Sequence, residues 1–124
     1  MRISPLEAEA IARAFRSDPA LRAKLPDVVE RLRRELGKVE ESTRRQNFDC
    51  PLLEGTRCLV HDRAKPIGCT AWNPGREFTS AGWTAFAERD ELNDRILGPR
   101  WKLRVIPLWL KRVFADELRR GESE

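Results

Sequence analysis

All three cysteines of the chain and its only histidine fall within one segment, residues 47–76. The same segment holds three prolines and three glycines, residues that favour turns over helices and strands. It offers little periodic apolar surface, so we expect something other than ordinary packing to fix its conformation. The sequence therefore predicts an irregular loop that depends on a bound group.

The four residues follow the spacing C-x7-C-x2-H-x7-C, which makes Cys50, Cys58, His61 and Cys69 candidate metal ligands. Three thiolates and one imidazole form a complete tetrahedral set for Zn²⁺, and a structural zinc site contributes on the order of 10 kcal/mol to folding. The alternative is that the cysteines are simply buried, as free cysteines often are. The intervals differ from those of common zinc fingers, so the spacing alone leaves both interpretations open.

A helix is predicted before this loop, at residues 5–16. Ser4-Pro5-Leu6-Glu7 has the pattern of a capping box with proline at the first helical position. The apolar residues that follow recur on one helical face, which we expect to enter the core.

Two further helices are predicted between this helix and the loop. Asp18-Pro19 repeats the start signal and predicts a short helix. A longer amphipathic helix should then run to about Arg45, because apolar residues recur at steps of four and three. This stripe consists of Leu25, Val29, Leu32, Leu36 and Val39. We expect it to pack within the domain rather than form a coiled coil.

Helices are also predicted after the loop. One should begin at a cap at Thr79 or Ser80 and stop at Gly98-Pro99. Its apolar residues are Trp83, Phe86, Ala87, Leu92 and Ile96. A last helix should start at Pro107 and present four residues to the core, namely Leu110, Val113, Phe114 and Leu118.

The basic run that leads into the last helix, Arg100 to Arg112, interleaves cations with aromatic residues. Segments that bind nucleic acids or membrane surfaces share this pattern. We favour the simpler interpretation of a core-packing helix with solvated lysines and arginines.

These elements predict a mainly α fold, a small helical domain with an irregular Cys/His metal-binding loop between N- and C-terminal helices. The chain of 124 residues has the length of a single domain, residues 1–124. We divide it into N-terminal helices at 1–46, the Cys/His loop at 47–76 and C-terminal helices at 77–120.

Composition favours a cytoplasmic protein. The partner predicted from the Cys/His motif is a metal ion, and the sequence does not indicate whether there is a protein partner. No apolar run approaches the roughly 18 residues needed to span a bilayer, and the N-terminal residues lack a secretory apolar region. We therefore expect no membrane partner. A net charge of +4, from 24 basic and 20 acidic residues, is a weak signal for nucleic-acid binding.

The loop sequence resembles the later half of the YkgJ-type cysteine-cluster proteins, a family of zinc- or iron-chelating domains. The family pattern is approximately CP-x-L, a short turn, C-x-(I/V)-(Y/H), then RP-x-x-C-R and an aromatic-proline ending. The matching stretches are Phe48-Asp49-Cys50-Pro51-Leu52-Leu53, Cys58-Leu59-Val60-His61-Asp62 and Lys65-Pro66-Ile67-Gly68-Cys69. With the helix that starts at Ser4, the resemblance covers about residues 3–74.

The resemblance implies metal chelation, and it leaves zinc and iron open. The chain departs from the pattern at Lys65 and Thr70, where the family has arginines, and at Trp72-Asn73-Pro74, where the ending is longer. The family also has a first cysteine group before the helix, which implies either a site reduced here or a start upstream of Met1. Zinc suits the residues present, while an iron–sulfur cluster usually takes four thiolates.

Other functions are less well supported by the sequence. Cys58 with His61 could form a nucleophile and base, but no oxyanion device or orienting acid is evident, so we expect no catalysis. Thiols near Arg57, Arg63 and Lys65 could instead act in redox chemistry. The main alternative to metal binding is a helical interaction module with structural cysteines and a basic docking segment.

Overall fold

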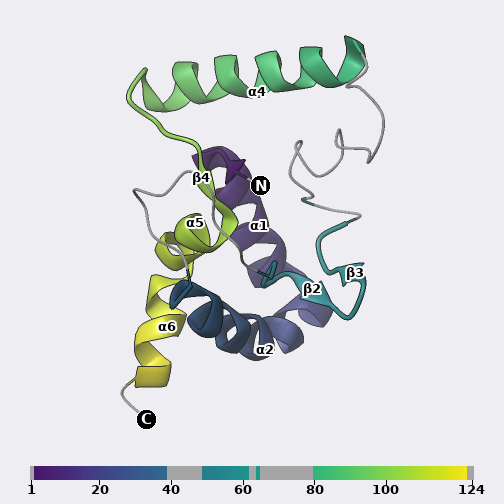
Figure 1. The fold of residues 1–124 in the computed structure, drawn as a ribbon, viewed down its shortest axis with the longest axis vertical. Coiled ribbons are helices and arrows are strands. Elements are labelled where there is room, and N and C mark those ends of the chain that lie inside the picture. Colours follow the sequence, from purple (N-terminus) through teal and green to yellow (C-terminus); the bar gives the residue numbers. More distant parts are fainter. Residues whose placement is uncertain (1, 39–48, 62–63, 65–79, 123–124) are drawn as a thin grey trace.

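The computed structural model describes residues 2–38, 49–61, 64 and 80–122, and this part of the chain is mainly helical (Figure 1). The helices are α1 (Pro5–Ser17), α2 (Pro19–Leu36), α4 (Ser80–Leu97), α5 (Ile106–Val113) and α6 (Ala115–Glu122). The strands are β1 (Arg2–Ile3), β2 (Leu53–Glu54), β3 (Arg57–Cys58) and β4 (Arg104–Val105). No helix in the described stretches is long and apolar enough to cross a membrane.

The predicted first helix is confirmed as α1, which ends one residue later than expected. The Ser4 hydroxyl accepts a hydrogen bond from the Glu7 backbone N–H, and the Glu7 carboxylate accepts one from the Ser4 N–H at 2.9 Å. This capping box satisfies two backbone donors that the start of a helix leaves without partners. The buried face of α1 consists of Ala8, Ile11, Ala12, Ala14 and Phe15.

The prediction of two helices after Asp18 is wrong, because α2 is a single helix that ends at Leu36. Asp18 ends α1 and also caps α2, where its carboxylate accepts the Ala20 N–H at 2.9 Å. Pro26 lies inside α2 although proline disfavours helix interiors. Burial of the adjacent Val28 and Val29 against the core offsets that local cost. Residues 39–48, with the expected helix end near Arg45, lie outside the described residues.

The core is formed where α1, α2 and α5 pack together. Phe15 and Phe114 meet edge to face, with ring centroids 5.9 Å apart. The strands β1 and β4 pair antiparallel and bring the N-terminal residues beside the segment that precedes α5. Ile3 is fully buried at this junction.

The bounds predicted for α4 are confirmed, but two of the apolar residues that it carries are exposed. Gly98 adopts φ of 79° directly after the helix, a conformation that glycine favours at helix ends. Leu92 and Ile96 are 45% and 59% exposed, whereas Arg89 and Asn93 are buried. The side chain of Trp83 lies outside the described part of the chain.

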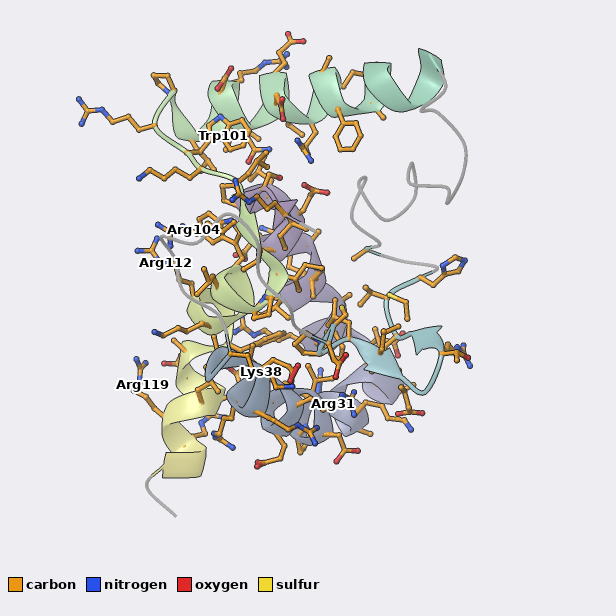
Figure 2. The ribbon with its side chains drawn as sticks, in the orientation of Figure 1. Arg31, Lys38, Trp101, Arg104, Arg112 and Arg119 are labelled. Carbon is orange, nitrogen blue, oxygen red and sulfur yellow. The ribbon has the colours of Figure 1, made fainter. Side chains whose placement is uncertain are left out.

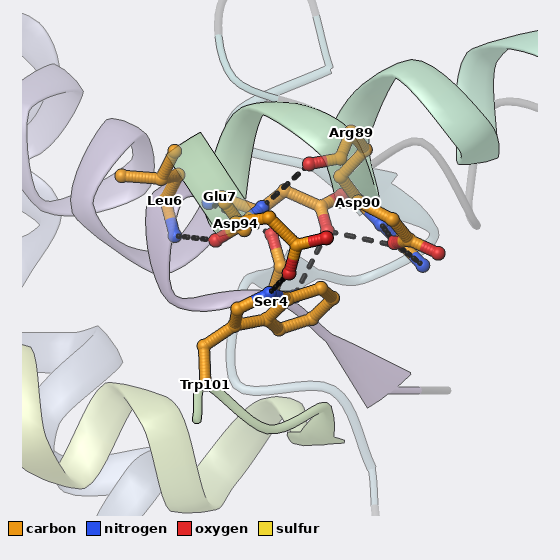
Figure 3. Close-up of polar contacts among 8 residues, drawn as sticks. Ser4, Leu6, Glu7, Arg89, Asp90, Asp94 and Trp101 are labelled. Atoms are coloured by element: carbon orange, nitrogen blue, oxygen red, sulfur yellow. Dashed lines mark hydrogen bonds and ion pairs between the residues drawn. The ribbon is translucent and has the colours of Figure 1, made fainter. Parts of the chain in front are cut away.

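Polar contacts explain why α4 buries the face that carries Arg89 and Asn93. It lies across the start of α1, where the Asn93 side-chain oxygen accepts the Leu6 N–H at 3.3 Å (Figure 3). The Arg89 guanidinium lies 3.4 Å from the Glu7 carboxylate in a nearly buried ion pair. The first turn of α1 carries backbone donors and the capping carboxylate, so the face opposite it on α4 must be polar.

The predicted last helix is divided into α5 and α6. Phe114 ends α5 with φ of −108° and ψ of 25°, outside the helical region, and its ring is fully buried against Phe15. The prediction that Leu110, Phe114 and Leu118 enter the core is confirmed, and Val113 is partly buried. Two short helices, in place of the single predicted one, therefore bring the expected apolar residues to the core.

Candidate metal site

The described half of the predicted loop contains a β-hairpin. Strands β2 and β3 pair antiparallel, with Leu53 opposite Cys58 and Glu54 opposite Arg57. Gly55 and Thr56 form the two-residue connection, and Gly55 adopts φ of 65°. A positive φ at the first central residue matches the right-handed twist of the paired strands and favours glycine.

A β-turn that begins at a cysteine lies on each side of this hairpin. The Leu53 N–H donates to the Cys50 carbonyl at 3.0 Å, and the His61 N–H donates to the Cys58 carbonyl at 3.2 Å. The first and fourth α-carbons of a β-turn lie within about 7 Å. Because Leu53 is directly opposite Cys58, both cysteines lie at the open end of the hairpin.

The hydrogen-bond pattern limits the distance between the two cysteines. Leu59 donates to the Leu52 carbonyl at 2.9 Å, so the next pair, Leu53 and Cys58, is of the non-hydrogen-bonded kind. Such pairs have α-carbons about 4.5 Å apart. The α-carbons of Cys50 and Cys58 are therefore no more than about 11.5 Å apart.

Ordinary packing holds this hairpin, which corrects the expectation that the loop lacks a core of its own. Leu52 is 1% exposed and Val60 is fully buried, and both belong to the main core. Cys50 and Cys58 are half-buried and pack against that core. Burying a Leu or Val side chain contributes roughly 1.5–3 kcal/mol, so two such residues can anchor a short hairpin.

Two side chains of α2 bind the backbone on either side of Cys50. The Glu35 carboxylate accepts the Asp49 N–H at 2.7 Å, and the Arg31 Nε donates to the Pro51 carbonyl at 3.0 Å. Arg31 and Glu35 are one helical turn apart, so they lie on the same face of α2. Figure 2 labels Arg31 on this helix and Lys38 just after its end.

Glu35 remains ionised in this setting. It is only 2% exposed, and Lys38 lies 2.9 Å from its carboxylate. The hydrogen bonds from Lys38 and from the Asp49 N–H lower the pKa of Glu35, although burial acts in the opposite direction. The charged carboxylate therefore persists well below neutral pH.

A second ion pair joins α2 to the turn of the hairpin. Lys24 lies 2.9 Å from the Glu54 carboxylate, and its hydrogen bond lowers the pKa of Glu54. Both side chains are well exposed, and exposed pairs contribute little to stability. Packing and the contacts of Arg31 and Glu35 are thus the main attachments of the hairpin.

The predicted ligands differ in how exposed they are. Cys50 and Cys58 are half-buried at the open end of the hairpin, whereas His61 is exposed. Cys69 lies outside the described residues. Within the described stretches, no group of three or more His, Cys, Asp or Glu side chains is arranged to hold a metal. Half-buried thiols in tight turns fit a thiophilic metal such as zinc.

The sequence interpretation missed Arg31 and Glu35. A signal for Glu35 was present, because it follows Val28 and Leu32 at the i, i+4 and i+7 positions of the buried face. A carboxylate on an apolar stripe requires partners, and here Asp49 and Lys38 supply them.

Comparisons of the chain with models of protein families, with curated proteins and with solved structures found no significant match. The resemblance to the cysteine-cluster proteins therefore remains a prediction from the loop motif. Proposals about function have to be argued from the residues themselves.

Proposed function

We propose that this protein binds a metal ion, zinc in the first instance, through the thiolates of Cys50, Cys58 and Cys69 with His61 as the fourth ligand. The observation that carries the proposal is the pair of cysteine-led β-turns at one end of an anchored hairpin. Such turns aim the backbone and side chain of each cysteine in a defined direction. This preorganisation reduces the conformational entropy that metal binding would otherwise have to overcome.

The donor chemistry supports zinc over hard cations. Thiolates and neutral imidazole are soft and borderline donors, which suit Zn²⁺ and iron but not Mg²⁺ or Ca²⁺. An iron–sulfur cluster is the alternative, since the family resemblance includes iron chelation. We propose binding only, without a catalytic step.

The residues of the chain would contribute in different ways. Cys50 and Cys58 would supply ligands from a fixed framework, because Leu52 and Val60 hold the hairpin in the core. Arg31 and Glu35 would orient the Cys50 turn from outside the ligand shell. His61, being exposed, would be the most easily replaced ligand.

Metal analysis of protein purified without added metal tests the proposal, combined with an absorption spectrum. We expect close to one zinc per chain, or a brown chromophore if iron is bound. The Cys58→Ser variant should lose the metal, while Thr56→Ala in the exposed hairpin turn serves as a matched control and should keep it.

Metal-free wild-type protein with intact fold would contradict the proposal. That result would favour the alternative of a helical interaction module whose cysteines are structural. Equal metal content in the Cys58→Ser variant and its control would also contradict it, because the metal would then be bound elsewhere.

A further inference from the structure

A second surface, remote from the hairpin, carries an unusual concentration of exposed aliphatic side chains. Among the described residues, five large hydrophobic side chains are exposed, and four lie on the end of α4 and the segment after it. They are Leu92 (45%), Ile96 (59%), Leu97 (48%) and Leu103 (38%). Clustered exposure of this kind marks interaction surfaces rather than ordinary solvent-facing positions.

Exposed cations accompany these residues. Arg100 and Lys102 are exposed and have no ion-pair partner among the described residues. We define the α4 corner as Leu92, Ile96, Leu97, Arg100, Lys102 and Leu103. Figure 1 shows it where the chain leaves α4, at an extremity of the molecule.

The nearby acidic groups contact residues other than Arg100 and Lys102. Asp94 accepts the indole N–H of Trp101 at 2.6 Å, and Glu91 is paired with Arg95 at 3.0 Å. No acidic residue occurs in the sequence between Asp94 and Asp116. The corner thus combines apolar side chains with two cations that form no ion pair among the described residues.

We propose that the α4 corner docks on an anionic lipid surface. Leu97 and Leu103 would enter the boundary between head groups and acyl chains, while Arg100 and Lys102 would contact lipid phosphates. Trp101, half-buried between them, has the amphipathic character that suits this boundary. This peripheral docking departs from the expectation that the chain has no membrane partner, because that expectation rested on the lack of a spanning segment. It does not depend on the proposed metal site.

Nucleic acid fits this surface less well. Trp109 is only 9% exposed, and the guanidiniums of Arg104 and Arg112 lie 5.1 and 5.8 Å from its ring centre. The ring therefore offers no free face for base stacking. Figure 2 shows Arg104 and Arg112 below Trp101, on the same side of the molecule. Contacts to phosphates alone would also leave the four aliphatic side chains in water.

A second copy of the chain is disfavoured by charge. A face-to-face contact through the corner would bring Arg100 and Lys102 near their own equivalents in the partner copy. An anionic bilayer satisfies both components of the surface, because it buries aliphatic side chains and presents negative charge.

Co-sedimentation with lipid vesicles tests this proposal. The 124-residue chain is mixed with vesicles of phosphatidylcholine alone, or of equal parts phosphatidylcholine and phosphatidylglycerol. We expect binding to the anionic vesicles only, weakened when the ionic strength is raised from about 0.05 M to about 0.5 M.

Matched variants locate the binding surface. Arg100→Gln with Lys102→Gln removes two cations, and should weaken binding to anionic vesicles about thirtyfold. Leu103→Gln should weaken it as well, whereas Leu53→Gln, at a residue that is also 38% exposed but lies on the hairpin, should not. Arg57→Gln is the corresponding charge control, because Arg57 is exposed and also lies on the hairpin.

The proposal is overturned if anionic vesicles are not bound, if neutral vesicles are bound equally well, or if corner and hairpin variants behave alike. Light scattering on the same samples measures self-association. A dimer that Leu103→Gln dissociates would assign the corner to a second copy instead. Binding of duplex or single-stranded oligonucleotides in place of vesicles would likewise contradict the lipid assignment.

Discussion

Glu35 is a charged residue on the buried face of α2, and it connects the helix to the backbone beside Cys50. Its carboxylate is stabilised by Lys38 and by the Asp49 N–H, so its pKa in the folded protein is lowered. A lowered folded-state pKa means that ionised Glu35 stabilises the fold. This contribution is complete above the ordinary carboxyl pKa of about 4.3 and is lost as the pH falls through the lowered folded value.

We predict that Glu35→Gln reduces the free energy of unfolding by about 1 to 2 kcal/mol at neutral pH. The amide oxygen can still accept the Asp49 N–H, but the attraction to Lys38 is lost. The variant should also lose less stability than the wild type on acidification. Urea unfolding at several pH values measures both effects. Glu30→Gln is the control, because the Glu30 side chain is 75% exposed, and equal effects of the two substitutions would contradict the prediction.

His61 and Cys58 should differ in importance for metal binding. His61 is exposed, and the family pattern admits tyrosine at this position, so water can replace it as the fourth ligand. We predict that His61→Ala retains the metal with weaker affinity, whereas Cys58→Ser loses it. Competition with a coloured chelator measures the affinity. Loss of the metal in His61→Ala but not in Cys58→Ser would reverse the assigned order.

At the scale of elements, the hairpin depends on the packing of alternate residues. Leu52 and Leu53 are neighbours in sequence, but Leu52 is 1% exposed and Leu53 is 38% exposed. We predict that Leu52→Ala reduces the free energy of unfolding by about 2 to 5 kcal/mol, and that Leu53→Ala costs much less. Urea unfolding of the two variants makes the comparison.

The comparison should hold when a chelator is present, because packing rather than metal is expected to hold the described hairpin. Hydrogen exchange at the Leu59 backbone amide, which donates to the Leu52 carbonyl, measures local opening of the hairpin directly. Two results together would show that metal binding holds the hairpin instead. The Leu59 amide would lose its protection from exchange when the chelator is added, and Leu52→Ala would barely change the free energy of unfolding.

Local signals in the sequence predicted element ends better than element partners. The capping box at Ser4 and the glycine at position 98 act within a few residues, so the bounds of α1 and the end of α4 could be predicted. The sequence predicted two helices where α2 is one, and α2 continues through Pro26 because a helix interior tolerates proline when tertiary packing offsets its cost. The buried face of α4 depends on the distant Leu6 and Glu7, which no local pattern indicates.

At the candidate site, too, local signals could be predicted from the sequence and tertiary contacts could not. The spacing of Cys50 and Cys58 indicated residues that the hairpin brings to one end, but the hairpin itself was hidden in a segment without long periodicity. Its anchors, Leu52 and Val60, are isolated apolar residues that gain significance only from the core that receives them. Cys69 lies outside the described residues, so its role remains a prediction.

At the scale of the whole molecule, α4 is attached to the rest of the protein mainly through the start of α1. The Arg89 and Glu7 side chains are 7% and 11% exposed, so their ion pair is largely removed from water. Figure 3 shows this pair beside the contact of Trp101 with Asp94. Removing one member of a buried pair leaves the other charge without compensation.

We predict that Arg89→Met reduces the free energy of unfolding by about 3 kcal/mol. Arg95→Met is the matched control, since Arg95 forms an exposed i, i+4 pair with Glu91 and should contribute no more than about 0.5 kcal/mol. Thermal and urea unfolding of both variants test the difference. Similar stability of the two would show that the polar contact does not hold α4 in place.

The central claim of metal binding is tested most directly by zinc-edge X-ray absorption of the purified protein. A site built from Cys50, Cys58, Cys69 and His61 predicts three sulfur neighbours at about 2.3 Å and one nitrogen at about 2.0 Å from the metal. A first shell of nitrogen and oxygen alone, or protein without bound metal, would contradict the claim.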